Sequence, residues 1–206
     1  LLMLNRHRAM SARELSELVL TDKEYENPLG TVRTHLYRLR KMSELLSEKE
    51  LIITKSSGYR INPDLKIMVD YEQFEKLCGS ITTFMPDQKQ IEILKEAVKI
   101  YDGKLFPNGS GDVWHISYSA KYHLMYIKAV DQLMELLNKI EDNKALHDYA
   151  MRTIKIDPDN PTIIYWLVVA LRKNGAIDMA KKHLESAKAR LLEEEYQELE
   201  YRLKIA

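Results

Sequence analysis

An internal repeat limits the folds open to this chain more than any other feature of its sequence. When the sequence is shifted by 34 residues against itself, small or apolar residues align with small or apolar residues. The matched pairs are Val130 and Ile164, Leu133 and Leu167, Leu137 and Leu171, Leu146 and Ala180, Ala150 and Leu184, and Thr153 and Ala187. Repeats of about this length are typical of antiparallel helix pairs that stack and share a core. The pattern predicts an all-helical arrangement for this part of the chain.

The whole region after Val69 has helical periodicity, interrupted by glycine and proline. The expected helices cover residues 71–80, 88–102, 113–138, 142–156, 161–174 and 176–204. The repeat resembles the tetratricopeptide repeat, because Ala180 and Ala187 lie on the second helix and Asp157-Pro158 closes the unit. That resemblance implies an α-α superhelix. An ordinary helical bundle with chance periodicity stays open as the alternative.

The first 50 residues have clear helix-start signals. Ser11 with Glu14 forms a capping box, and Asn27 before Pro28 gives an N-cap followed by proline at the first helical position. The second signal predicts a long helix over residues 28–47. Its apolar face carries Val32, Leu36, Leu39 and Leu46, and its opposite face carries Thr31, Thr34, Tyr37, Arg38 and Lys41. One face is expected to pack and the other to be free.

Two β-rich runs follow this helix, at 51–54 and 59–61, and a turn containing Gly58 joins them into a predicted hairpin. A helix fits the major groove of DNA, where arginine can bind guanine and threonine or tyrosine can contact base edges or phosphates. Lys55, Ser56 and Ser57 at the hairpin tip could then contact the adjacent backbone. The alternative is that the basic residues are only the solvated face of an amphipathic helix.

Residues 31–41, followed by 54–61, resemble the OmpR/PhoB-type winged helix in order and spacing. The resemblance implies that Thr34 and Arg38 face bases. It implies phosphate or flanking contacts for Thr31, Arg33, Tyr37 and Lys41, and wing contacts for Lys55 and Ser56. The family's N-terminal β-sheet is missing here, so we expect an N-terminally truncated winged helix-turn-helix.

Residues 69–77, 101–106 and 145–158, together with Trp114, resemble the bacterial transcriptional activation domain of SARP-type (antibiotic-regulatory-protein) activators. In that family the domain follows a winged helix, and some members carry a response-regulator receiver. The resemblance implies a mainly α chain with a DNA-binding domain at 1–68 and a tetratricopeptide-like activation domain at 69–206. It also implies a transcriptional activator that binds double-stranded promoter DNA as a homodimer and contacts RNA polymerase or an effector.

The composition restricts other classes of function. Lysine and arginine equal aspartate and glutamate at 31 each, so a nucleic-acid surface must be a local patch. The single cysteine, Cys78, fits a reducing compartment, and the absence of a long apolar run or signal peptide predicts a cytoplasmic chain without a membrane partner. His115, His123 and His147 form no metal or catalytic motif, so we expect no enzyme activity, metal or cofactor.

Two further alternatives remain open. The aromatic residues Tyr118, Tyr122, Tyr126, Tyr165 and Trp166 could line a groove for a peptide or effector, although core packing is the favoured interpretation. The neutral net charge would also permit a helical-repeat adaptor whose winged helix binds protein instead of DNA.

Overall fold

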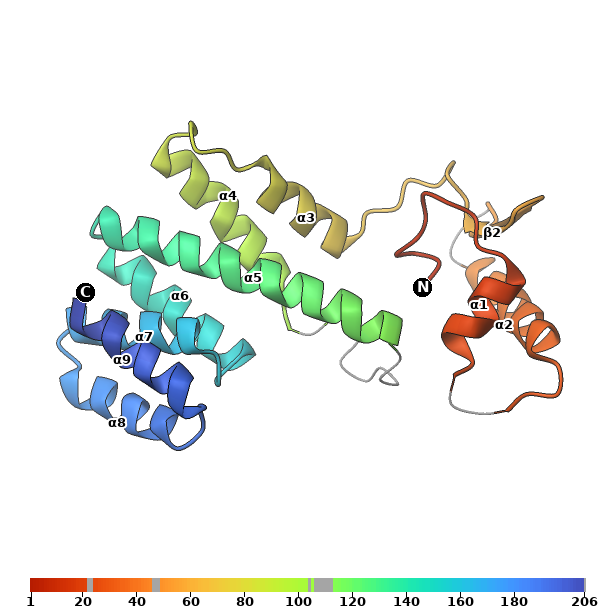
Figure 1. Cartoon of the computed structure of the whole chain (residues 1–206). Coiled ribbons are helices and arrows are strands. Elements are labelled where there is room, and N and C mark those ends of the chain that lie inside the picture. Colours follow the sequence, from red (N-terminus) through yellow and green to blue (C-terminus); the bar gives the residue numbers. More distant parts are fainter. Residues whose placement is uncertain (22–23, 46–48, 104, 106–112, 206) are drawn as a thin grey trace. The chain divides into compact units, whose positions relative to one another are not determined.

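The computed structural model describes residues 1–21, 24–45, 49–103, 105 and 113–205 (Figure 1). Over these residues the chain is mainly helical, with nine helices and one two-stranded sheet. It divides into two compact units with separate cores. The core of the first lies within Leu1–Met68, and the core of the second lies among helices α3 to α9.

The first unit contains α1 (Ala12–Val19), α2 (Pro28–Ser43), β1 (Ile52–Lys55) and β2 (Gly58–Ile61). Both helices begin at the residues that the sequence predicts. The Ser11 hydroxyl accepts a hydrogen bond from the Glu14 amide at 3.0 Å, and the Asn27 side chain accepts one from the Gly30 amide at 2.9 Å. These caps satisfy amides that the first turn of a helix leaves without partners.

Helix α2 is shorter than predicted, because it ends at Ser43 and not at residue 47. Leu45, two residues after this end, is 88% exposed, and a helical turn that packs against no core has little stability of its own. The packed face is also shorter. Val32 and Leu36 are buried in the core of the unit, whereas Leu39 is 48% exposed because the core cluster does not extend to it. Leu46 lies outside the described residues.

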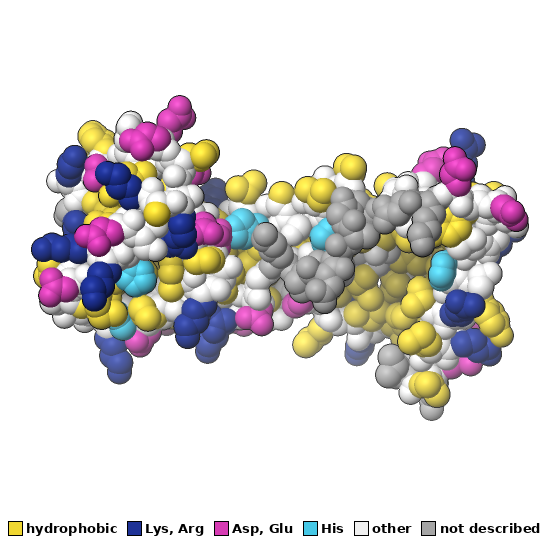
Figure 2. Space-filling view, turned by 90° about the horizontal axis from the view of Figure 1, so that it is seen from below, with side chains coloured by type: hydrophobic (Ala, Val, Ile, Leu, Met, Phe, Trp, Pro, Cys, Tyr) yellow, Lys and Arg dark blue, Asp and Glu magenta, His cyan; other side chains and the backbone are white. Residues whose placement is uncertain are grey.

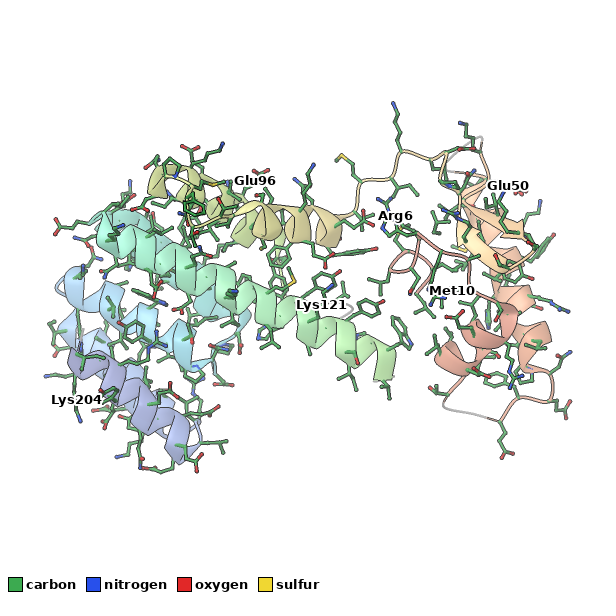
Figure 3. The ribbon with its side chains drawn as sticks, turned by 45° about the horizontal axis from the view of Figure 1, so that its top comes forward. Arg6, Met10, Glu50, Glu96, Lys121 and Lys204 are labelled. Carbon is green, nitrogen blue, oxygen red and sulfur yellow. The ribbon has the colours of Figure 1, made fainter. Side chains whose placement is uncertain are left out.

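The hairpin has the antiparallel register Ile52 with Ile61, Ile53 with Arg60, Thr54 with Tyr59, and Lys55 with Gly58. A third segment joins it, which the sequence did not predict. Met10, labelled in Figure 3, exchanges two backbone hydrogen bonds of 2.8 Å with Tyr59. Gly58 has a φ of 129°, and a Cβ there would overlap the carbonyl oxygen of Met10. The close approach of the two backbones therefore requires glycine at this position.

The second unit is all helical. Its elements are α3 (Asp70–Ser80), α4 (Asp87–Ile100), α5 (Val113–Lys139) from Ser117 onward, α6 (Asn143–Ile156), α7 (Pro161–Lys173), α8 (Ile177–Lys188) and α9 (Glu193–Ile205). The single helix predicted over residues 176–204 is wrong. The amides of Arg190 and Leu191 both bond to the Ala187 carbonyl and close a turn. This turn returns α9 to α7 and α8, where Leu199 and Leu203 are buried (Figure 1).

The 34-residue repeat is present in three dimensions. Of the twelve residues in the six matched pairs, eleven are buried, and Leu184 is half-buried. The turns recur as well, since the amide of Asp142 bonds to the Leu137 carbonyl at 3.0 Å and that of Ala176 to the Leu171 carbonyl at 2.9 Å. These bonds, five residues apart in sequence, define the same Schellman-type helix end in both repeats. The buried pattern and the turns support a genuine repeat over chance periodicity.

Candidate nucleic-acid interface

The predicted site residues on α2 lie on its solvent-facing side. Thr31 is half-buried, whereas the other five are exposed to solvent: Arg33, Thr34, Tyr37, Arg38 and Lys41. Val32 and Leu36 on the opposite side fix the orientation of the helix through the core. The structure therefore brings the predicted α2 residues together on one accessible face.

The two threonines on this face already use their hydroxyl hydrogens. Thr31 donates to the carbonyl of Asn27 and Thr34 donates to the carbonyl of Gly30, each at 3.0 Å. A hydroxyl that donates still has lone pairs to accept a further bond. Both residues can therefore offer an acceptor and a methyl group to a partner without a change of rotamer.

The cations on this face differ in their partners. The Lys41 ammonium binds both carboxylate oxygens of Glu44, at 3.0 and 3.1 Å, and this hydrogen bond raises the pKa of Lys41. Arg33 and Arg38 are exposed, and within the described part of the chain no ion pair engages them. The two arginines are thus available to an anionic partner at once, whereas Lys41 must first exchange Glu44.

Lys55 and Ser56 are exposed at the hairpin tip. A contact between the hairpin and α2 is made by Arg40, which lies between Arg38 and Lys41 in the sequence. Arg40 is only half-buried, yet its side chain binds the hairpin and not the solvent: Nε donates to the Ile52 carbonyl at 2.8 Å. The sequence indicates this role only weakly. Arg40 lies one helical turn after the buried Leu36, and residues four positions apart lie on the same face of a helix.

In the described residues of the second unit, three titratable side chains meet at His123. His123 lies between the Tyr101 hydroxyl, at 3.0 Å from Nδ1, and the Asp157 carboxylate, at 2.8 Å from Nε2. Of the clustered aromatic residues, Tyr122, Tyr126 and Trp166 are buried, which agrees with core packing for these three. Among the described residues no group of three His, Cys, Asp or Glu side chains could hold a metal ion.

The surface charge of the second unit is mixed. Figure 2 shows basic and acidic side chains next to one another over its helices. No helix in the described ranges is long and apolar enough to cross a membrane.

The repeated helix turns and buried stripes place the chain among proteins built from stacked helix pairs. Residues 69–202 match the family model of the bacterial transcriptional activator domain. The chain therefore belongs to the bacterial transcriptional activator domain family. This match is consistent with the SARP-type resemblance, but it does not extend to residues 1–68, so the OmpR/PhoB-type resemblance of that segment stays a prediction. No curated protein matches the chain.

Proposed function

We propose that this chain is a sequence-specific, DNA-binding transcriptional activator whose residues 1–68 act as a winged helix. The observation that carries the proposal is the accessible face of α2, on which Arg33 and Arg38 are exposed. The hairpin that follows α2 in the sequence is hydrogen-bonded to this helix. An α-helix of this kind fits the major groove, and a β-hairpin beside it can contact the minor groove or the phosphate backbone. The family match of residues 69–202 supports the role in transcription.

The proposed contacts follow the position of each side chain. Thr34 and Arg38 contact base edges, because they lie one helical turn apart on the exposed face. Arginine binds guanine through two hydrogen bonds in the major groove. The phosphates or flanking base edges are contacted by Thr31, Arg33, Tyr37 and Lys41, and the wing contacts are made by Lys55 and Ser56.

The second unit is proposed to act as a tetratricopeptide-like interaction domain. Stacked helix pairs present extended surfaces to partners, and we propose RNA polymerase or an effector as the partner here. The complex on DNA is proposed to be a homodimer, since paired half-sites are common for helix-turn-helix proteins. Within this proposal the protein is cytoplasmic and has no catalytic activity.

The test is selection of bound duplexes from a random DNA library at two salt concentrations, followed by affinity measurements on the selected sequence. Arg38→Ala should cost about 1–3 kcal/mol on that sequence and relax base preference at one position. Lys41→Ala should weaken binding to all sequences and reduce the salt slope by about one. If the wild-type chain enriches no sequence and shows no salt-dependent binding, DNA recognition is excluded.

One observation favours a second candidate, a protein-binding adaptor without DNA recognition. Tyr37, Leu39 and Met42 on α2 are 60%, 48% and 67% exposed, and exposed apolar side chains on one helix can mark a protein interface. The two candidates differ in the residues they need. Leu39→Ser with Met42→Ser should leave DNA affinity nearly unchanged if α2 reads DNA through Arg38, and should abolish partner binding if the adaptor candidate is right.

A further inference from the structure

Arg40 forms a three-part bridge between α2 and the hairpin. Its Nε donates to the carbonyl oxygen of Ile52 at 2.8 Å, and its Nη2 donates to the hydroxyl of Thr54 at 2.7 Å. Its guanidinium carbon also lies 5.7 Å from the centre of the Tyr59 ring. A planar guanidinium can make these contacts together because its donors point in fixed directions, which a lysine ammonium cannot reproduce.

The bridge reaches the part of the hairpin nearest its tip. Thr54 and Tyr59 are partners in the register, and the next pair, Lys55 with Gly58, closes the turn. The opposite edge of β2 is held by Met10, through its two hydrogen bonds to Tyr59. A two-stranded hairpin alone is marginally stable in water. Arg40 and Met10 together therefore fix where the tip lies relative to α2.

We propose that Arg40 is a positioning residue for DNA binding. It holds the hairpin tip where Lys55 and Ser56 contact the same DNA duplex whose major groove binds α2. The inference rests on the proposed function. Two contact regions that are rigidly linked bind one ligand with a high effective concentration, and the gain is lost when the link is loose. Arg40 thus makes the contribution of the hairpin to DNA affinity depend on the binding of α2.

The competing role for an arginine on this helix is a direct phosphate contact. The two roles make different demands on the side chain. A phosphate contact needs a positive charge, which lysine supplies as a point charge. The bridge needs two directed donors and a flat cation against the Tyr59 ring, which lysine does not supply.

The decisive experiment is a double-mutant cycle on the selected DNA duplex, with Arg40→Lys and Lys55→Ala. If Arg40 positions the hairpin, Arg40→Lys should weaken binding about tenfold, the usual effect of losing a charge-assisted hydrogen bond. Lys55→Ala should weaken binding severalfold in the wild type and have little further effect in the Arg40→Lys background. Near wild-type affinity of Arg40→Lys, with the full effect of Lys55→Ala retained, overturns the inference and leaves a phosphate contact.

A second variant removes one partner of the bridge and leaves every charge in place. Thr54→Val deletes the hydroxyl that accepts from Arg40 Nη2, so it should lower affinity in the same direction as Arg40→Lys and be less than additive with it. Full additivity contradicts the bridge. Arg13→Lys is the matched control, because Arg13 is exposed on α1 and pairs with Glu17 of the same helix at 2.9 Å, and it should leave affinity unchanged.

Amide hydrogen exchange without DNA provides the readout on the hairpin itself. In Arg40→Lys the hairpin amides should exchange faster by roughly tenfold, whereas amides of the second unit should exchange as in the wild type. Equal hairpin exchange in both proteins overturns the positioning role even if affinity falls. Failure of the wild-type chain to bind DNA is a different result, since it rejects the proposed function first and the inference with it.

Discussion

The carboxylate of Asp131 on α5 accepts a hydrogen bond from the indole N–H of Trp166 on α7 at 2.6 Å. The same carboxylate lies 3.5 Å from the guanidinium of Arg202 on α9, which in turn lies 4.2 Å from the centre of the Tyr165 ring. One carboxylate therefore joins the first helices of successive helix pairs. This cross-helix network is additional to the buried apolar stripe that the repeat predicts.

Asp131→Ala should destabilise the second unit by about 1.5–3 kcal/mol, because it leaves the Trp166 N–H and Arg202 without their acceptor. Asp131→Asn should cost less, since the amide oxygen can still accept from the indole. Equilibrium urea unfolding measures both. Asp148→Ala is the control, because this carboxylate is exposed and its ion-pair contact with the neighbouring His147 is long, at 3.7 Å, so a change below about 0.5 kcal/mol is expected. Equal losses for Asp131→Ala and Asp148→Ala would contradict the role of the network.

Removal of the Glu44 carboxylate, which pairs with the Lys41 ammonium, should raise DNA affinity. In Glu44→Gln the Lys41 ammonium loses its ion pair and can bind a phosphate without exchanging a partner. We expect a severalfold increase in affinity at low salt and a steeper salt dependence, measured by fluorescence anisotropy on the selected duplex. Glu17→Gln on α1 removes the same charge from a different ion pair and is the control. If both variants raise affinity equally, the gain reflects net charge and not Lys41.

Gly58→Ala should disrupt the first unit. Alanine would have to adopt the φ of 129° that glycine has here, and its Cβ would overlap the backbone of Met10. The backbone pairing of Met10 with Tyr59 should therefore break. A loss of about 2 kcal/mol or more is expected from the strain and the two backbone bonds. Gly79→Ala in α3 is the opposite case, because among the described residues outside its own helix backbone and chain neighbours nothing lies within 4 Å of the added Cβ, and it should stabilise by about 0.5–1 kcal/mol. The midpoint of thermal unfolding should therefore fall for Gly58→Ala and rise for Gly79→Ala.

The two equivalent turns of the repeat contain different residues at the left-handed position, Glu141 with φ 58° and Gly175 with φ 76°. Glu141→Gly should be neutral or stabilise by up to about 1 kcal/mol, since relief of left-handed strain outweighs the greater freedom of the unfolded chain. Gly175→Ala should destabilise by about 1 kcal/mol for the same reason, although in the described part of the chain its added Cβ would have open space beyond its two neighbours. Urea midpoints compare the pair, and a stabilising Gly175→Ala would contradict the equivalence.

Alkaline pH should weaken the second unit through Tyr101. Burial, and to a smaller extent the nearby Asp157 carboxylate, raise the pKa of this phenol from 10.0 to about 12. The unfolded chain releases the proton near pH 10 while the folded chain keeps it, so stability should be full below pH 10 and decline between pH 10 and 12. In Tyr101→Phe this contribution is absent. Its free energy of unfolding should fall less steeply over that window, and an identical slope would exclude Tyr101 as a contributor.

Prediction from sequence succeeded where the cause is local. The caps at Ser11 and Asn27, the apolar stripes and the repeat period all depend on residues within a few positions of one another. It was wrong for the end of α2 and for the single helix over 176–204, because the length of a helix depends on tertiary packing. In α2 the apolar side chain of Leu45 finds no core, and after Ala187 the chain turns so that Leu199 and Leu203 of α9 are buried. The accessible face of α2 was predictable, whereas the hydrogen bond from Arg40 to the hairpin was not, because its acceptor lies on a distant strand.

By itself, the sequence determined the helical class of residues 69–205, the helix starts and the spacing of the repeat. Periodicity and capping depend on residues that are close together in the sequence. Only the tertiary structure decided that Arg40 binds the hairpin while Arg38 faces solvent, and that Met10 joins Tyr59 in the sheet. The reason is physical: two arginines two positions apart have the same chemistry, and which one finds an acceptor depends on a strand that lies twelve residues further along the chain.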